Sequence, residues 1–236
     1  MTSPTSDSSA TTAVPGQFQF PREYFFPPFF TRQTNLTTHH AQLVKWSSLV
    51  LSYCAHHRIY KLSISSSGIY SSNSSTLPQQ SDLDPDSQPN PNSQNSNKLE
   101  LFHNPKINRQ LSLSDIREVI DFLRKDNRAE YIYKSEQPPN GLVDSSYNHP
   151  AGGGDVVWIF WRTPEEWASM IEKWVDETGQ KGSVLTLYEL TYGEATRGTE
   201  FHGLDPELLQ KALATLVKRG KAQIFGQEDS KGVKFF

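Results

Sequence analysis

The feature that most constrains this chain is a short stretch near its start in which aromatic rings are mixed with prolines. Residues 18–30 read Phe-Gln-Phe-Pro-Arg-Glu-Tyr-Phe-Phe-Pro-Pro-Phe-Phe and hold seven aromatic rings. Proline fixes φ, removes an amide donor and pushes the preceding residue toward extended geometry, so the segment around Pro27 and Pro28 is predicted to be a stiff, extended hook. No regular element of the stretch itself is expected to bury the rings, although each gains about 1.5–3 kcal/mol from full burial. The rings are therefore expected to be buried elsewhere.

Two burial sites are open to this stretch, which we call the arm (residues 18–37). The arm can insert into a partner protein as a docking peptide, which is the hypothesis favoured by its composition, or it can fold back on its own domain. A stiff arm loses less conformational entropy on docking than a flexible one does. The sequence alone leaves both possibilities open.

Length, charge and cysteine content set the class of protein. A chain of 236 residues has room for one large or two small domains. Its net charge of -3 gives it no general attraction for nucleic acid or acidic lipid. The single cysteine, Cys54, lies in an apolar helical pattern and is expected to be a buried, inert thiol. We expect a soluble intracellular protein, because residues 1–17 read as a disordered, Ser/Thr-rich N-terminus without a secretory signal and no run approaches the roughly 18 apolar residues of a membrane span.

Residues 38–161 are expected to form a first domain in which helices precede a β-hairpin. The expected elements are a helix from a cap at Thr37 or Thr38 to about His57, a strand at 61–64, a helix that starts at Ser112 or Ser114, and strands at 129–133 and 156–161. Residues 65–97 are rich in Ser, Asn, Gln and Pro. A structureless segment of that length is unusual inside a compact domain, so it is predicted to be a disordered insertion.

Residues 162–236 are expected to form a second domain with a similar order of elements. Thr163-Pro164-Glu165-Glu166 is typical of a helix start, with Thr at the N-cap and Glu closing a capping box. The elements that follow are expected to be a helix ending at Gly179, a short helical turn at 187–190, a helix opening at Asp205-Pro206 and ending at Gly220, and a hairpin made of 221–225 and 232–236. The pattern as a whole predicts an α+β protein with two winged-helix domains in tandem.

Winged helices often bind DNA, so a nucleic-acid-binding transcription factor is the alternative function. A recognition helix needs Arg and Lys facing phosphates and base edges. In the second domain Asp205 and Glu207 occupy the helix end that would meet the bases, and the charges on the candidate helix of the first domain cancel. Lys218, Arg219 and Lys221 are expected to form only a weak basic patch.

Neither a metal site nor a catalytic centre is predicted. The pairs His39-His40 and His56-His57 are about 24 Å apart on a helix, because each residue rises about 1.5 Å, so each pair is expected to be solvated at a helix end. Residues 152–154 are three glycines without the strand-to-helix context of a phosphate loop, and are read as a hairpin tip. The carboxylates of Glu165 and Glu166 are explained by helix capping. We expect no catalytic residues and no cofactor.

Several stretches resemble a known family. They are Trp161-Arg162-Thr163-Pro164-Glu165-Glu166-Trp167, Ser183-Val184-Leu185-Thr186-Leu187-Tyr188-Glu189-Leu190-Thr191, Glu200-Phe201-His202-Gly203-Leu204-Asp205, Gly232-Val233-Lys234-Phe235-Phe236, Phe26-Pro27-Pro28-Phe29-Phe30 and Trp46-Ser47-Ser48-Leu49-Val50-Leu51. In these stretches the chain closely resembles the vacuolar protein sorting-associated protein 25 family, which supplies the small subunit of ESCRT-II.

The resemblance implies a non-catalytic protein that bridges the larger ESCRT-II subunits to ESCRT-III while ubiquitinated membrane proteins are sorted into multivesicular bodies. In this family two Pro-Pro-x-aromatic motifs near the N-terminus dock into winged-helix domains of the two larger subunits. The second motif is intact at residues 27–30, whereas the first, at residues 20–24, has one proline where the strict form has two. The partner-binding residues that the resemblance implies are Pro21, Tyr24, Phe26, Pro27, Pro28, Phe29 and Phe30.

The resemblance also implies that the second winged-helix domain binds an ESCRT-III subunit of the vacuolar protein sorting-associated protein 20 type. The protein would then be cytoplasmic and recruited peripherally to endosomal membranes, with indirect membrane contact and no bound nucleic acid. A docking role for the arm predicts that Phe29→Ala together with Phe30→Ala releases the larger subunits while both domains stay folded.

Overall fold

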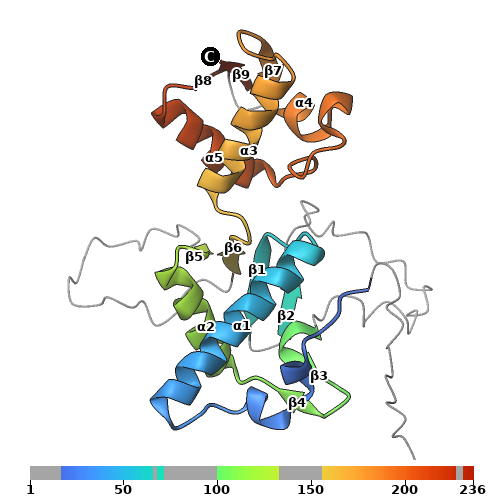
Figure 1. Ribbon diagram of the computed structural model, residues 1–236, viewed down its shortest axis with the longest axis vertical. Coiled ribbons are helices and arrows are strands. Elements are labelled where there is room, and N and C mark those ends of the chain that lie inside the picture. The colour runs from blue at the N-terminus through green and yellow to red at the C-terminus, as the bar shows by residue number, and fades with distance from the viewer. Residues whose placement is uncertain (1–16, 66–67, 72–99, 133–155, 227–230) are drawn as a thin grey trace, which may run out of the picture.

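The computed structural model describes residues 17–65, 68–71, 100–132, 156–226 and 231–236. In these residues the chain forms two bodies, which lie one above the other in Figure 1 and are joined by a short segment after strand β6 (Val156–Ile159). Each body contains helices and an antiparallel sheet, which confirms the predicted α+β class. The expected disordered N-terminus falls almost wholly outside the described residues.

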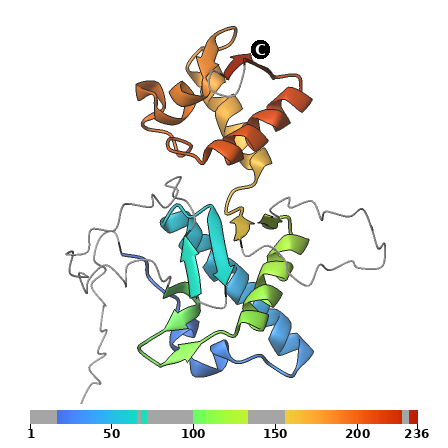
Figure 2. The same cartoon turned by 180° about the vertical axis from the view of Figure 1, so that it is seen from behind.

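The first body packs two helices with a four-stranded antiparallel sheet. Helices α1 (Leu36–His56) and α2 (Leu113–Lys125) contact each other, and the sheet has the order β2-β1-β6-β5. Its other strands are β1 (Lys61–Ser65), β2 (Gly68–Ser71) and β5 (Ala129–Ile132). The predicted pairing of the strands near 129 and 156 is confirmed, and the loop between them, with its three glycines, lies outside the described residues. From behind, in Figure 2, β1 and β2 lie over α1.

A small antiparallel pair completes the first body and contacts the arm. The 3₁₀ helix η3 (Glu100–Phe102) leads into β3 (His103–Asn104), which pairs with β4 (Arg109–Gln110). Leu101 and Phe102 are fully buried in the same core as α1. Helix α2 then begins at the predicted cap Ser112, whose hydroxyl accepts a hydrogen bond from the Asp115 amide at 3.2 Å.

Helix α1 begins earlier than the sequence pattern predicts. The side-chain Oδ1 of Asn35 accepts hydrogen bonds from the backbone amides of Thr37 (3.0 Å) and Thr38 (3.1 Å), so Asn35 is the N-cap. The predicted caps at Thr37 or Thr38 are therefore wrong. Asparagine is at least as good an N-cap as threonine, and here the capping residue lies one position ahead of the apolar Leu36.

The predicted disordered insertion at 65–97 is wrong at its beginning. Strand β1 extends to Ser65, and β2 pairs with it antiparallel, with Ile69 opposite Ile64 and Gly68 opposite Ser65. The Ser-rich segment contains two residues that favour strands, Ile69 and Tyr70, and β2, which includes both, pairs with the edge of β1. Residues 66–67 and 72–99 lie outside the described residues.

The second body follows the predicted order of elements. Helix α3 (Pro164–Glu177) starts at the predicted capping box, in which the Thr163 hydroxyl accepts from the Glu166 amide at 3.2 Å and the Glu166 carboxylate accepts from the Thr163 amide at 2.7 Å. The elements that follow are β7 (Val184–Thr186), α4 (Leu187–Tyr192), η4 (Glu194–Thr196), α5 (Pro206–Lys218), β8 (Ala222–Phe225) and β9 (Gly232–Phe235). The predicted terminal hairpin is confirmed as β8 and β9, and the sheet has the order β7-β9-β8.

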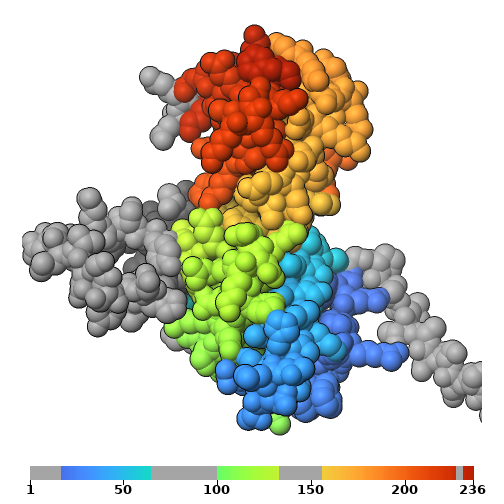
Figure 3. Space-filling model, turned by 60° about the vertical axis from the view of Figure 1, so that its left-hand side comes forward, coloured from blue at the N-terminus to red at the C-terminus, as the bar shows by residue number. Residues whose placement is uncertain are grey.

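Strand β6 contributes to both hydrophobic cores. Val157 and Ile159 are buried in the core of the first body, whereas Trp158 and Phe160 are buried with the core of the second. Successive side chains of a strand point to opposite faces, so one strand can serve two cores. The predicted domain boundary between residues 161 and 162 thus crosses a shared apolar layer. Figure 3 shows the orange and red body resting on the green and blue one at this junction.

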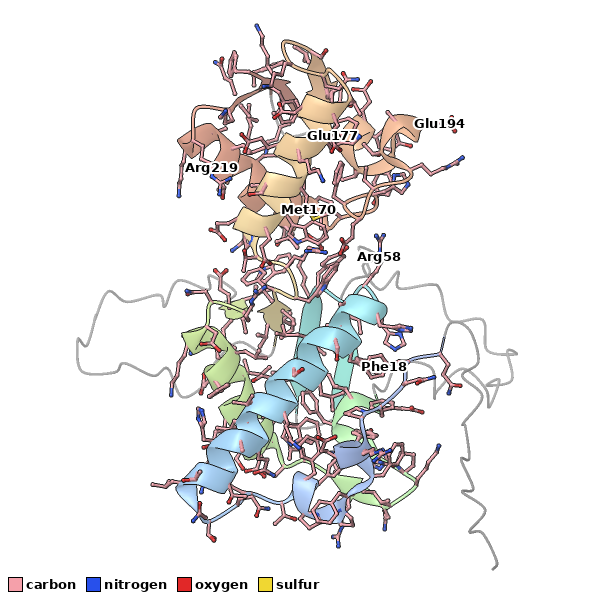
Figure 4. The ribbon with its side chains drawn as sticks, viewed as in Figure 1. Phe18, Arg58, Met170, Glu177, Glu194 and Arg219 are labelled. Atoms are coloured by element: carbon pink, nitrogen blue, oxygen red, sulfur yellow. The ribbon has the colours of Figure 1, made fainter. Side chains whose placement is uncertain are left out.

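Polar contacts tie the two bodies at the same junction. The guanidinium of Arg58 donates to the backbone oxygens of His202 and Glu200, both at 2.7 Å, and Figure 4 shows Arg58 at the end of the first body that faces the second. Arg162 makes two hydrogen bonds of 2.7 Å to the Glu200 carboxylate. Further ion pairs that join the bodies include Arg128–Glu166 and Lys211–Glu130. These pairs are partly exposed, so they orient the junction more than they stabilise it.

Candidate partner-binding site

The arm forms two consecutive 3₁₀ turns instead of the extended hook that the sequence predicts. These turns are η1 (Arg22–Phe25) and η2 (Pro27–Phe30). The backbone amide of Tyr24 donates to the Pro21 oxygen at 3.0 Å, and the amide of Phe29 donates to the Phe26 oxygen at 2.9 Å. Proline has the φ that the first turn of a helix needs and no amide to leave unpaired there, so Pro27 and Pro28 begin a turn.

Three rings of the arm are buried in the first body's own core. Tyr24, Phe29 and Phe30 have exposed fractions of 2%, 7% and 5% and share the core with Trp46 of α1. The Phe29 ring stacks on Trp46 with a centroid distance of 4.3 Å and an interplanar angle of 6°. For these three rings the structure confirms the alternative in which the arm folds back on its own domain. Helix α1 and the η3–β3 segment supply an apolar surface that the arm's own sequence does not reveal.

Hydrogen bonds from distant residues hold the first turn of the arm. The hydroxyl of Tyr24 donates to the backbone oxygens of Glu100 and His103, the latter at 3.0 Å. Burial is the main cause that raises the pKa of Tyr24, so the phenol stays protonated and remains a donor. The Tyr24 ring also stacks on Phe20 at 3.9 Å. Figure 4 shows Phe18, at the start of the arm, beside the C-terminal half of α1.

Other residues of the arm, in and between the two turns, face outward. Phe26 is 60% exposed and Phe25 is 43% exposed, and Pro21, Pro27 and Pro28 are exposed as well. The seven residues predicted to bind partners therefore fall into two groups, buried Tyr24, Phe29 and Phe30 and exposed Pro21, Phe26, Pro27 and Pro28. The predicted set leaves out Phe25, which is also exposed and directly precedes Phe26 in the aromatic run.

A surface groove runs between the arm and α1. Its lining combines apolar and polar side chains, namely Phe18, Gln19, Pro21, Glu23, Phe29, Lys45, Ser48, Leu49 and Ser52. The Glu23 carboxylate lies 2.5 Å from the Lys45 ammonium across this groove, and that hydrogen bond lowers the pKa of Glu23. The groove adjoins Pro21, so it continues the exposed apolar surface of the arm.

A carboxylate on α2 binds the end of the arm. Arg32 donates to both oxygens of Glu118, at 3.0 and 3.2 Å, and the His39 Nε2 lies 2.8 Å from the same carboxylate. The hydrogen bond from Arg32 lowers the pKa of Glu118, with His39 acting in the same direction. The prediction that both histidine pairs are solvated is wrong for His39, which is buried, while His40 is exposed.

Metal ligands, the cysteine and the helices were each the subject of a prediction from the sequence. Within those residues no group of three or more His, Cys, Asp or Glu side chains is placed to hold a metal ion. Cys54 is fully buried, which confirms the predicted burial, and this burial raises the pKa of its thiol. Of the helices described here, none is both long and apolar enough to cross a membrane.

The predicted basic patch of the second body is largely neutralised. Glu172 of α3 lies 3.8 Å from the Arg219 guanidinium and 3.4 Å from the Lys221 ammonium. Phosphate binding requires cations that are free to replace counterions. This arrangement gives the nucleic-acid alternative no support.

Comparison with known proteins identifies relatives over nearly the whole chain. The family model described as "ESCRT-II complex subunit" matches residues 23–205. Vacuolar protein-sorting-associated protein 25 of Homo sapiens is 37% identical over 219 residues, which cover 93% of this chain and 98% of that protein. The proteins of the same name from Dictyostelium discoideum and Drosophila melanogaster are 36% and 32% identical, again over 93% of this chain and over 96% and 99% of theirs.

Solved structures agree with this relation. A chain in a structure of the ESCRT-II endosomal trafficking complex superposes with a TM-score of 0.63 at 26% identity, over 91% of this chain and 98% of that one. A chain in a crystal structure of endosomal complex ESCRT-II, composed of VPS22, VPS25 and VPS36, gives a TM-score of 0.62 at 26% identity over the same shares of both chains. The chain described here belongs to the ESCRT-II complex subunit family, a family of components of an endosomal trafficking complex.

Proposed function

We propose that this chain is a non-catalytic ESCRT-II subunit that binds the larger ESCRT-II subunits through the outward face of its arm. The observation that carries the proposal is Phe26, an aromatic side chain that is 60% exposed between two turns fixed to the body. Exposed Pro27 and Pro28 follow it directly, so a rigid apolar ridge faces solvent. Aromatic anchors at the centre of interfaces carry much of the binding energy.

The buried and exposed residues of the arm have different roles in this proposal. Pro21, Phe26, Pro27 and Pro28, together with Phe25, contact the partner. Tyr24, Phe29 and Phe30 act indirectly, because their rings fix the arm to the first body. The solved ESCRT-II assembly that contains VPS22 and VPS36 beside VPS25 supports the choice of partner.

We further propose that each body is a winged-helix unit, with a boundary at residues 161–162, and that the second unit recruits an ESCRT-III subunit of the vacuolar protein sorting-associated protein 20 type. The order helix, strand, two helices and hairpin in the second body supports the winged-helix assignment. The chain would thereby bridge ESCRT-II to ESCRT-III at endosomal membranes, during the sorting of ubiquitinated proteins into multivesicular bodies. Larger subunits assembled with this chain should capture that ESCRT-III subunit, and larger subunits without it should not.

The test of the arm is the Phe26→Ala variant of the full chain, co-expressed with the two larger ESCRT-II subunits. Loss of an interface anchor worth about 2 kcal/mol weakens binding roughly 30-fold. Tyr188→Ala is the matched control, because Tyr188 is also an exposed ring but belongs to α4 of the second body. Equilibrium titration should show weaker binding for Phe26→Ala and unchanged binding for Tyr188→Ala. Unchanged affinity for both variants would contradict the proposed contact.

A further inference from the structure

Three buried polar side chains of the first body direct hydrogen bonds to the backbone of the arm. Gln42 and Trp46 come from α1, Asn104 comes from β3, and all three are at least nine-tenths buried. Burying an amide side chain is unfavourable unless its polar atoms find hydrogen-bond partners. An apolar residue at position 42 or 104 would fill the same space without that requirement, so the hydrogen bonds themselves need an explanation.

The second turn of the arm, η2, is held from α1 by two side chains. The Gln42 Nε2 donates to the backbone oxygens of Phe29 at 2.8 Å and Thr31 at 2.9 Å. The indole Nε1 of Trp46 donates to the same Phe29 oxygen at 3.0 Å. Phe29 thus receives two donors on its carbonyl while its ring stacks on the Trp46 ring, so both its backbone and its side chain are fixed to α1.

The first turn, η1, is held from a different element. The Asn104 Nδ2 donates to the Tyr24 backbone oxygen at 2.7 Å, while its Oδ1 accepts from the Lys106 amide at 3.0 Å. Both polar atoms of the Asn104 side chain therefore have hydrogen-bond partners. Phe26 lies between the two turns, one fixed by Asn104 and the other by Gln42 and Trp46.

We propose that Gln42, Trp46 and Asn104 are positioning residues for partner binding. This inference rests on the proposed function of the arm. Ring burial is not directional, but hydrogen bonds to carbonyls set the orientation of each turn and so direct the Phe26 ring outward. If the arm opens, only the fraction of molecules with a closed arm binds, and the apparent affinity falls by that fraction.

The test combines Gln42→Leu with Trp46→Phe in the full chain. Phenylalanine at position 46 keeps an aromatic ring against Phe29 but has no N–H donor, so the Phe29 and Thr31 carbonyls lose the side-chain donors that reach them from α1. The Phe29 carbonyl then has no side-chain donor, whereas the exposed Thr31 carbonyl keeps the one from Gln33 at 2.8 Å. A buried carbonyl left unpaired favours opening by about five- to 150-fold. Hydrogen exchange should accelerate at least about fivefold at the Phe29 and Thr31 amides, and affinity for the co-purified larger ESCRT-II subunits should fall at least about fivefold.

Two further variants separate positioning from general loss of stability. Ser47→Ala is the control, because Ser47 is the buried neighbour of Trp46 and its hydroxyl makes no hydrogen bond to the described residues. Asn104→Leu removes the side-chain donor that reaches the first turn from β3, and it should also weaken binding. This variant keeps the proposal testable where the double variant folds poorly. Exchange at the α2 amides reports whether the first body, which carries all of these substitutions, stays folded.

The outcomes are distinct for the two proposals. Faster exchange in the arm with an affinity equal to that of Ser47→Ala would overturn the positioning role, as would unchanged exchange in the arm. If Phe26→Ala weakens binding while the double variant and Asn104→Leu do not, the contact through Phe26 stands and only the positioning role fails. If Phe26→Ala has no effect either, the proposed contact itself fails.

Discussion

Replacing Phe29 by alanine should destabilise the first body, in contrast to the expectation that both domains stay folded when Phe29 and Phe30 are changed. The Phe29 ring is 7% exposed, stacks on Trp46 at 4.3 Å and meets Phe30 edge-on at a centroid distance of 6.1 Å. Removal of a buried phenylalanine ring from a packed core costs about 3–5 kcal/mol, because the lost apolar contacts leave a cavity. We therefore expect Phe29→Ala to lower the free energy of unfolding by that amount.

Urea denaturation followed by circular dichroism and tryptophan fluorescence measures this change. With an m-value of about 1–3 kcal/mol/M, a loss of 3 kcal/mol moves the midpoint by about 1 M or more. Phe26→Ala is the matched control, because the same atoms are removed from a ring that is largely exposed in the same arm. Exposed substitutions usually change stability by no more than about 0.5 kcal/mol.

The contrast between these two variants tests the burial of the arm directly. Similar, small shifts for both would refute the packing described for Phe29. If Phe29→Ala lowers the free energy of unfolding by about 3–5 kcal/mol, weaker partner binding by that variant reports unfolding. Only Phe26→Ala then measures the contact itself.

Three further predictions concern a helix cap, an ion pair and the cysteine. Thr163→Ala should lower the free energy of unfolding by about 0.5–2 kcal/mol through loss of the capping box that starts α3, and thermal denaturation measures it. Glu118→Gln should cost about 1 kcal/mol or less near neutral pH, because its pair with Arg32 is partly exposed. The pKa of Glu118 is lowered in the folded state, so this contribution is present above the unfolded pKa of about 4.3 and disappears as pH falls through the folded value; a difference that persists in acid would contradict the assignment. Cys54 should resist maleimide labelling in the folded chain and react after unfolding in urea, as followed by mass spectrometry, because its thiol is fully buried and its pKa is raised.

Local patterns predicted most of the regular elements. The Thr163 capping box and the Ser112 cap involve residues close together in sequence, and each strand of the two hairpins has its own apolar, β-rich run, so these signals are local. The same reasoning placed the cap of α1 two to three residues late, because Asn35 rather than Thr37 or Thr38 caps the helix. It also missed β2, because the edge of β1 pairs with a segment whose Ser-rich composition does not favour a strand.

The sequence by itself established an arm dense in aromatic residues and proline, two successive sets of helices and hairpins, and a resemblance to one family. The tertiary structure alone decided which rings of the arm face inward. The backbone oxygens that accept hydrogen bonds from the Tyr24 hydroxyl, for example, belong to Glu100 and His103, more than 70 residues further along the chain. It also decided that alternate residues of β6 belong to two different cores. Burial depends on surfaces that distant segments bring together, and no local period or composition records that arrangement.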